Sequence, residues 1–261
     1  MMSGARTHVS TGVVAPQLTF ASASGGVGKS TLALTAAWLA SAAGVSTALV
    51  EADLQFGDMG YWLGLDDDVP SLAAGFECEP LHIADGLALY KAPALPEVAE
   101  QVADGVAELV AAMRRTYELV IVDTGQFWSG LTADVVLNAS AVVLVADSRP
   151  SSVMGLVRAQ ELCARIGVAS SRCTAVYNRY SGKARLSEKE VRAALGSRDV
   201  CTVPEGRAVV DSLMSIGAID ELVASGNPMV QGVDGLLMEL LPRVGIVYGG
   251  ALVRRRRAVA R

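Results

Sequence analysis

The sequence predicts a three-layer α/β/α fold in which helices cover both faces of a mostly parallel central sheet. Apolar, β-branched runs alternate with helical patterns along the chain, which is typical of successive βαβ units. Some runs, such as AVVLVA at 141–146, are apolar throughout, as expected of strands buried on both faces. With 261 residues and 51% hydrophobic composition, the chain can bury a large core.

Each predicted strand is a short apolar run that is bounded by polar or glycine-containing turns. Strands are predicted at residues 18–23, 47–52, 87–91, 118–123, 141–146, 173–178 and 200–203. The helical segments are Ala- and Leu-rich or amphipathic, and the first of them is expected to stop at Gly44. Helices are predicted at residues 31–43, 69–76, 97–115, 152–166, 187–195, 207–216 and 230–241.

The composition indicates a soluble protein with one domain. No repeat or low-complexity linker interrupts residues 17–243, which follow a disordered lead-in at 1–16 and precede a basic tail at 244–261. A charged fraction of 19% and a net charge of -5 argue against a disordered or generally nucleic-acid-coating chain. No apolar run approaches the roughly 20 residues that span a bilayer, and residues 1–14 lack a secretory signal. We therefore expect a cytoplasmic protein.

Cysteine and histidine usage offers no metal site. The four cysteines include no CxxC pair, and two histidines are too few for a histidine-based site. We read the cysteines as small, partly buried residues of a reducing compartment.

A glycine-rich turn, TFASASGGVGKST, joins the first predicted strand to the first predicted helix. Its glycines allow backbone N–H groups to face phosphate oxygens, and the helix start adds further free N–H groups. In this pattern Lys29 reaches the β- and γ-phosphates, Ser30 ligates Mg²⁺ and Thr31 reaches the α-phosphate. The turn is typical of a P-loop NTPase, although Ala23 replaces the usual first glycine; the alternative is a turn without a ligand. The predicted contacts are Ser24, Gly25, Gly26, Val27, Gly28, Lys29, Ser30 and Thr31.

Acidic residues end two further predicted strands. Glu51 and Asp53 follow the strand at 47–52, and Asp123 ends the strand at 118–123. Ligands of open α/β sheets bind at the carboxyl ends of strands, so these acids can hold Mg²⁺ or orient an attacking water. The alternative is that they are helix caps or surface acids. Asp147 also ends a strand, and we read it as a turn residue.

Taken together, these segments resemble the ParA/MinD family of P-loop ATPases over residues 17–241. SGGVGKST is similar to the family's deviant Walker A motif, KGGxGK[ST]. VEADLQFGDMGYWLGL resembles its switch I segment, in particular that of the CpaE/TadZ branch associated with Tad (Flp) pilus assembly. VIVDTG resembles switch II, and VYNRYSGKARLSEKEV and VPEGRAVVDSLMSIG resemble the segments around the nucleotide base.

The resemblance implies ATP and Mg²⁺ as cofactors and a homodimer as the working form. It implies catalytic roles for Lys29 and for Asp53, which would position the hydrolytic water. The implied metal-side residues are Ser30, Glu51, Asp53 and Asp123, and the implied adenine-side residues are Asn178, Arg179, Pro204 and Glu205.

Two positions depart from the family pattern. The family's signature lysine, which reaches the partner's nucleotide across the dimer, is replaced by Ser24, which carries no charge. Gly125 stands in switch II where the family commonly has proline. We therefore expect nucleotide binding to be retained and ATP hydrolysis to be weak.

These observations favour an ATP-binding positioning protein that acts in Tad pilus assembly. The alternatives are a septum-site or chromosome-partition ATPase, a nucleotide-binding scaffold with little turnover, and a metabolic P-loop enzyme. The tail VRRRRAVAR is read as solvated, with membrane contact as its alternative, which would place the protein at the inner face of the membrane or at a cell pole. DNA binding by a basic face around residues 158–185 is not favoured.

Overall fold

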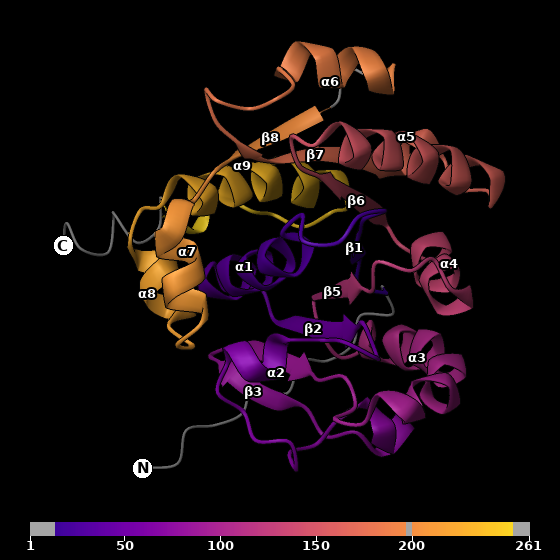
Figure 1. Cartoon of the computed structure of the whole chain (residues 1–261). Coiled ribbons are helices and arrows are strands. Elements are labelled where there is room, and N and C mark those ends of the chain that lie inside the picture. The colour runs from indigo at the N-terminus through magenta and orange to yellow at the C-terminus, as the bar shows by residue number, and fades with distance from the viewer. Residues whose placement is uncertain (1–13, 197–199, 253–261) are drawn as a thin grey trace.

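The computed structural model describes residues 14–196 and 200–252, and these form one eight-stranded sheet between two layers of helices (Figure 1). The strand order is β3-β4-β2-β5-β1-β6-β7-β8. The strands are β1 Gln17–Ala21, β2 Thr47–Ala52, β3 Leu81–Ala84, β4 Leu87–Tyr90, β5 Leu119–Thr124, β6 Ala141–Ala146, β7 Cys173–Tyr180 and β8 Val200–Pro204. Neighbouring strands pair in parallel, except that β3 runs antiparallel to β4 at one edge. The predicted three-layer α/β/α fold is confirmed.

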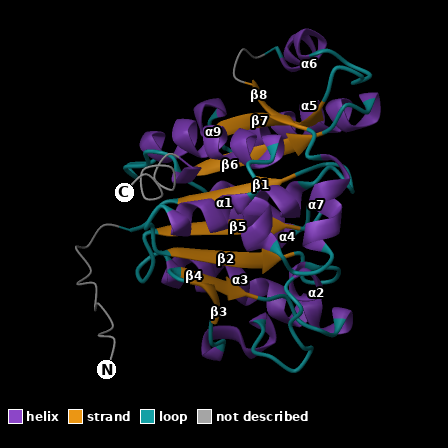
Figure 2. Cartoon of the chain, turned by 90° about the vertical axis from the view of Figure 1, so that its left-hand side faces the viewer, coloured by secondary structure: helices purple, strands orange, loops and turns teal. Residues whose placement is uncertain are grey.

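The helices divide between the two faces of the sheet. They are α1 Lys29–Ala42, α2 Met59–Trp62, α3 Ala99–Met113, α4 Gly130–Leu137, α5 Pro150–Arg165, α6 Glu188–Leu195, α7 Arg207–Met214, α8 Ile219–Ala224 and α9 Pro228–Arg243. The α1, α7, α8 and α9 helices pack with one another against one face. Helices α3 to α6 cover the other face, in two clusters (Figures 1 and 2).

Strand alternation explains how one strand serves both layers. In β2, Leu49 belongs to the core under α1, whereas Ala48 and Val50 face α3. Successive strand side chains point to opposite faces, and a strand that is apolar at every position can therefore be buried on both sides. The bounds predicted for β2 and β6 agree with the structure.

Short elements account for most differences from the sequence prediction. Strand β3 and helices α2, α4 and α8, which are four to eight residues long, were not predicted. The short helix predicted at 69–76 is a 3-10 helix that starts three residues later, Leu72–Glu77, and Gly75 interrupts it at φ 57°. The segment predicted as one helix at 97–115 divides into a 3-10 turn, Pro96–Val98, and α3.

The chain after α9 folds back onto that helix. Tyr248 and Ala251 are buried in the core that α9 shares with α1. The buried carboxylate of Asp234 accepts a hydrogen bond from the Tyr248 hydroxyl at 2.5 Å and one from the Ala251 backbone N–H at 3.0 Å. The first part of the predicted tail, 244–252, therefore packs against the domain, whereas its arginine run lies outside the described residues.

Replacing Tyr248 by phenylalanine is expected to lower the free energy of unfolding by about 1–2 kcal/mol. The substitution keeps the ring but removes one donor from a buried carboxylate, which then loses part of its compensation. Urea denaturation of the purified protein measures the change. Tyr61→Phe is the matched control because Tyr61 is exposed, and equal unfolding midpoints for the two variants would contradict the role given to this contact.

None of the helices within 14–196 and 200–252 has the length and apolar character required to cross a bilayer.

Candidate functional site

The carboxyl ends of the central parallel strands open onto a cavity of about 760 Å³. This is the edge of the sheet where ligands of open α/β folds bind. Three segments line the cavity: the turn after β1, the turn after β2 and the turn after β5. The lining includes residues 24–31, 52–58, 125–127 and 129, together with Ala99, Ala103, Leu131 and Arg179.

The predicted phosphate loop lies between β1 and α1 and requires glycine at particular positions. Gly28 precedes α1 at φ 85°, a left-handed conformation that side chains disfavour, and offers no side-chain cap to the helix. A Cβ there would lie 2.5 Å from Nδ2 of Asn178, and a Cβ on Gly25 would lie 2.2 Å from Oε1 of Gln126. The loop thus leaves the first backbone N–H groups of α1 without a side-chain cap, as an anion-binding turn requires.

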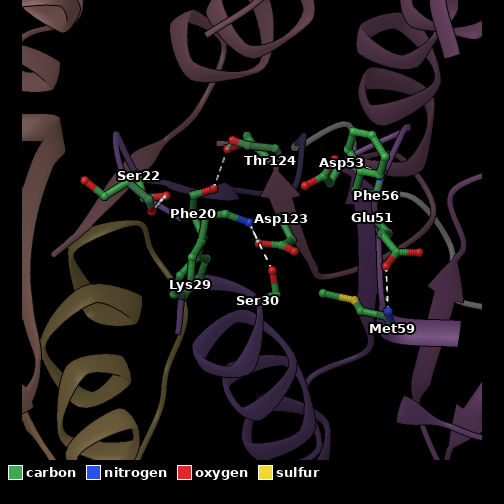
Figure 3. A network of polar contacts seen from close by, with 12 residues as sticks. Phe20, Ser22, Lys29, Ser30, Glu51, Asp53, Phe56, Met59, Asp123 and Thr124 are labelled. Atoms are coloured by element: carbon green, nitrogen blue, oxygen red, sulfur yellow. Dashed lines mark hydrogen bonds and ion pairs between the residues drawn. The ribbon is translucent and has the colours of Figure 1, made fainter. Parts of the chain in front are cut away.

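Lys29 is the first residue of α1, directly after the loop, and is only 7% exposed. Its ammonium forms an ion pair with Asp123 at the end of β5 and donates to the Ser30 hydroxyl at 3.1 Å (Figure 3). Burial raises the pKa of the Asp123 carboxyl, while the Lys29 ammonium acts in the opposite direction. The structure therefore brings together Lys29, Ser30 and Asp123, as the spacing of the motifs predicts.

The two acids at the end of β2 take different directions. Asp53 lines the cavity, and its Oδ1 accepts from the Phe56 N–H at 3.2 Å. Glu51 is buried, and its carboxylate points away from the loop toward Met59 (Figure 3). Its oxygens accept from the backbone N–H groups of Met59 at 2.7 Å and Ala92 at 2.9 Å.

The Glu51 carboxylate is thus committed to the backbone and does not join the other predicted metal-side residues. Burial raises its pKa from 4.5 to about 7, and the two N–H donors lower it only in part. No cluster of three or more His, Cys, Asp or Glu side chains that could cage a metal occurs among the residues described. The arrangement of Ser30, Asp53 and Asp123 suits Mg²⁺, which takes few protein ligands and shares substrate phosphates.

A second cavity, of about 240 Å³, adjoins the loop beside Gly28 and contains most of the predicted base-side residues. Asn178, Arg179 and Glu205 line it, together with Arg207. Arg179 and Arg207 adopt left-handed backbone conformations, at φ 56° and 59°, which is the kind of local strain that clusters at functional sites. Pro204 does not line this cavity; its ring lies 2.8 Å from where a Cβ of Gly232 on α9 would stand.

Asn178 has one half of its amide engaged and the other half free. Its Nδ2 donates to the Val27 carbonyl at 2.7 Å, which fixes the orientation of the amide. Its Oδ1 is buried and has no hydrogen-bond partner. A buried polar atom without a partner is costly, so an acceptor left free beside a cavity indicates a donor group on a ligand.

Sequence reasoning missed several residues that surround the phosphate loop. Gln126 covers Gly25, Phe127 lines the cavity mouth, and the Trp128 indole donates to the Ser22 carbonyl at 3.0 Å. Arg149, after β6, donates to the Gly25 carbonyl at 2.8 Å. Their common signal was available in the sequence, since each follows directly after a strand that ends at this edge of the sheet.

Comparison with known proteins agrees with this geometry. A family model described as the CobQ/CobB/MinD/ParA nucleotide binding domain matches residues 18–216. The chain belongs to this family. Its match extends from β1 to the end of α7 and so includes the phosphate loop, the acids after β2 and β5 and the base-side cavity. A comparison with curated protein sequences gives no match.

Solved structures of the CobQ/CobB/MinD/ParA family share the fold. A ParA family ATPase from Chlorobium tepidum TLS is 21% identical, with a TM-score of 0.75, and the match covers 86% of this chain and 99% of that one. The septum site-determining protein MinD of Pyrococcus horikoshii OT3, complexed with Mg-ADP, is 16% identical, with a TM-score of 0.75 and coverage of 88% and 98%. MinD of Aquifex aeolicus is 20% identical, with a TM-score of 0.69 and coverage of 87% and 99%. At these identities the likeness supports the fold, and the CpaE/TadZ branch stays a prediction.

Proposed function

We propose that the protein binds ATP with Mg²⁺ across the two adjoining cavities and acts as a nucleotide-dependent positioning or partition protein. The observation that carries the choice of ATP is the free Oδ1 of Asn178. Adenine presents an exocyclic N6 amino group, which donates hydrogen bonds, whereas guanine presents the O6 acceptor at the same place. A buried acceptor whose orientation is fixed by the Val27 carbonyl therefore favours adenine.

The phosphate side fits a magnesium-bound triphosphate. Lys29 and the N–H groups after Gly28 supply positive charge and donors, and Ser30, Asp53 and Asp123 supply oxygen ligands or second-sphere acceptors for Mg²⁺. The bound metal would neutralise phosphate charge. Lys29 is held by Asp123 in this structure, so a triphosphate has to compete with that carboxylate for the ammonium.

Slow hydrolysis follows from the same residues. Asp53 lines the cavity, and its Oδ1 accepts from the Phe56 N–H, which leaves Oδ2 to orient a water. Ser24 offers a hydroxyl where the resembling ATPases carry a lysine, and loss of such a charge lowers phosphoryl-transfer rates strongly. We therefore infer that nucleotide binding switches the state of the protein, and that ATP hydrolysis is slow compared with binding.

A homodimer that meets across the cavity mouth is the favoured working form. Phe56 and Phe127 lie in the segments after β2 and β5, are 74% and 78% exposed, and both line the mouth of the cavity. Exposed aromatic side chains beside a ligand site are typical of protein contacts. ATP-dependent dimerisation, followed by light scattering, tests this point and separates a switch from a metabolic enzyme.

The partner machine is proposed from the segment after β2, which resembles that of proteins associated with Tad pilus assembly. Septum-site or chromosome-partition work is the second candidate, and the family contains such proteins. A DNA-binding role is less favoured, because Arg172 donates to the Leu137 and Ala139 carbonyls and Arg165 lies 4.0 Å from Glu161.

Replacing Asn178 by alanine is expected to weaken ATP binding about tenfold and to reduce the preference for ATP over GTP. The variant removes the buried acceptor whose contact with the base carries the discrimination, and such contacts contribute about 1–3 kcal/mol. Titration calorimetry with both nucleotides and Mg²⁺ measures it. Asn138→Ala, an exposed asparagine at the end of α4, is the control. Equal affinity of the wild type for ATP and GTP would refute the assignment of adenine.

A further inference from the structure

The outer side of the phosphate loop packs against the beginning of α5. A Cβ on Gly155 of that helix would lie 3.2 Å from Cβ of Ala23 and 3.3 Å from Oγ of Ser24. Ser24, which carries no charge, thus lies beside the first turns of α5. A side chain at the start of that helix can therefore reach the loop.

Arg149 is that side chain. It stands directly before Pro150, the first residue of α5, and its Nη2 donates to the carbonyl oxygen of Gly25 at 2.8 Å. Gly25 is the neighbour of Ser24 in the loop. Among the residues that the structure describes, Lys29 and Arg149 are the cations that hydrogen-bond to this loop or to the start of its helix.

Asp147 holds the guanidinium in this position. The Nε atom of Arg149 lies 2.7 Å and 3.0 Å from the two carboxylate oxygens, and the Arg149 backbone N–H also donates to Oδ1 at 3.1 Å. Asp147 is buried, whereas the Arg149 side chain is 45% exposed. The guanidinium therefore bridges the two segments: its Nε contacts the Asp147 carboxylate, and its Nη2 donates to the loop.

We propose that Arg149 is a positioning residue of the phosphate loop and supplies, from the β6–α5 connection, the positive charge that Ser24 does not carry. The inference rests on the proposed function, because the loop is taken to hold the phosphates of ATP. It assigns a part in nucleotide binding to a residue outside the glycine-rich motif.

Peptide geometry gives the mechanism. The described chain has no cis peptide bonds, and in a trans peptide the C=O and N–H groups point in opposite directions. Holding the Gly25 carbonyl on Arg149 therefore directs the Gly26 N–H away from Arg149. A cation on the carbonyl also polarises that peptide, which makes its N–H a stronger donor to an anion. The effect grows with the negative charge that the loop has to hold.

The test compares two nucleotides that differ in charge. Wild type, Arg149→Ala, Arg149→Ala/Ser24→Lys and the control Arg165→Ala are titrated calorimetrically with MgADP and with the magnesium complex of AMPPNP, a non-hydrolysable ATP analogue. Arg149→Ala is expected to weaken AMPPNP about tenfold, the scale of a lost charge-assisted hydrogen bond, and to weaken MgADP less. The double variant is expected to recover most of the AMPPNP affinity, because Ser24→Lys returns a charge to the loop. Arg165→Ala is expected to bind as the wild type does.

A purely structural role of Arg149 predicts a different pattern. Both nucleotides would then weaken by the same factor, or not at all, and Ser24→Lys would restore neither; either result overturns the inference. If Arg149→Ala does not fold, Arg149→Lys replaces it: near-wild-type AMPPNP affinity supports the inference, and a tenfold loss contradicts it. Failure of the wild type to bind either nucleotide refutes the proposed function itself, and this inference with it.

Discussion

Replacing Lys29 by alanine is expected to abolish measurable MgATP binding and to lower the free energy of unfolding by about 3–5 kcal/mol at neutral pH. Both effects have one cause, since Lys29 is the cation of the phosphate loop and the partner of a buried acid. Asp123 is 1% exposed, and the Lys29 ammonium compensates its charge. Removing one member of a buried ion pair leaves the other uncompensated, and this costs several kcal/mol.

The two effects of Lys29→Ala can be separated with a second substitution. In Lys29→Ala/Asp123→Asn no charge is left buried, so most of the stability is expected to return, while nucleotide binding stays absent. Urea denaturation and calorimetry with MgATP measure the two properties. The stability loss of the single variant should also shrink at low pH, where Asp123 is protonated. A Lys29→Ala protein that binds MgATP as tightly as the wild type contradicts the assignment of the phosphate loop.

The sequence predicted well those parts of the fold that depend on the pattern of neighbouring residues. The bounds of β2 and β6 follow from short apolar runs, and the phosphate loop follows from glycines between a strand and a helix. Lys29 and Asp123 are separated by 94 residues, yet their meeting was predictable because parallel strands end at the same edge. Local sequence and sheet topology together were sufficient for these residues.

Glu51 shows why the rest was not predictable. Residues 51 and 53 are two apart, so in a continued strand both side chains would share one face. The strand ends at Ala52, however, and the Glu51 carboxylate instead accepts from the N–H groups of Met59 and Ala92. The position of α2, which contributes Met59, depends on packing that no pattern in the sequence expresses. The same applies to Pro204, which packs toward Gly232. For Arg149, the preceding strand places the residue at this edge of the sheet, but its contact with Gly25 depends on packing between two distant loops.

Buried Glu51 also gives the protein an expected dependence of stability on pH. Its pKa is about 7 in the folded protein and 4.5 as the ordinary value. Between these values the folded state binds the proton more tightly than the unfolded state, so stability is lost as the pH rises. A shift of this size corresponds to about 3 kcal/mol. The free energy of unfolding is therefore expected to fall by about that amount between pH 4.5 and a pH above 7.

The variant Glu51→Gln isolates this contribution. Glutamine does not titrate, so the part of the loss between pH 4.5 and pH 8 that is due to Glu51 should be absent from the variant's profile and should equal the change in the difference between the two proteins. The part due to Asp123, whose pKa burial also raises, remains in both profiles and cancels from that difference. The amide can accept only one of the two backbone N–H groups well, which lowers stability by an amount that does not vary with pH. Glu108→Gln, at an exposed position on α3, should follow the wild-type profile. Parallel pH profiles for wild type and Glu51→Gln would show that Glu51 ionises in the folded protein as it does in water, and its backbone contacts would then outweigh its burial.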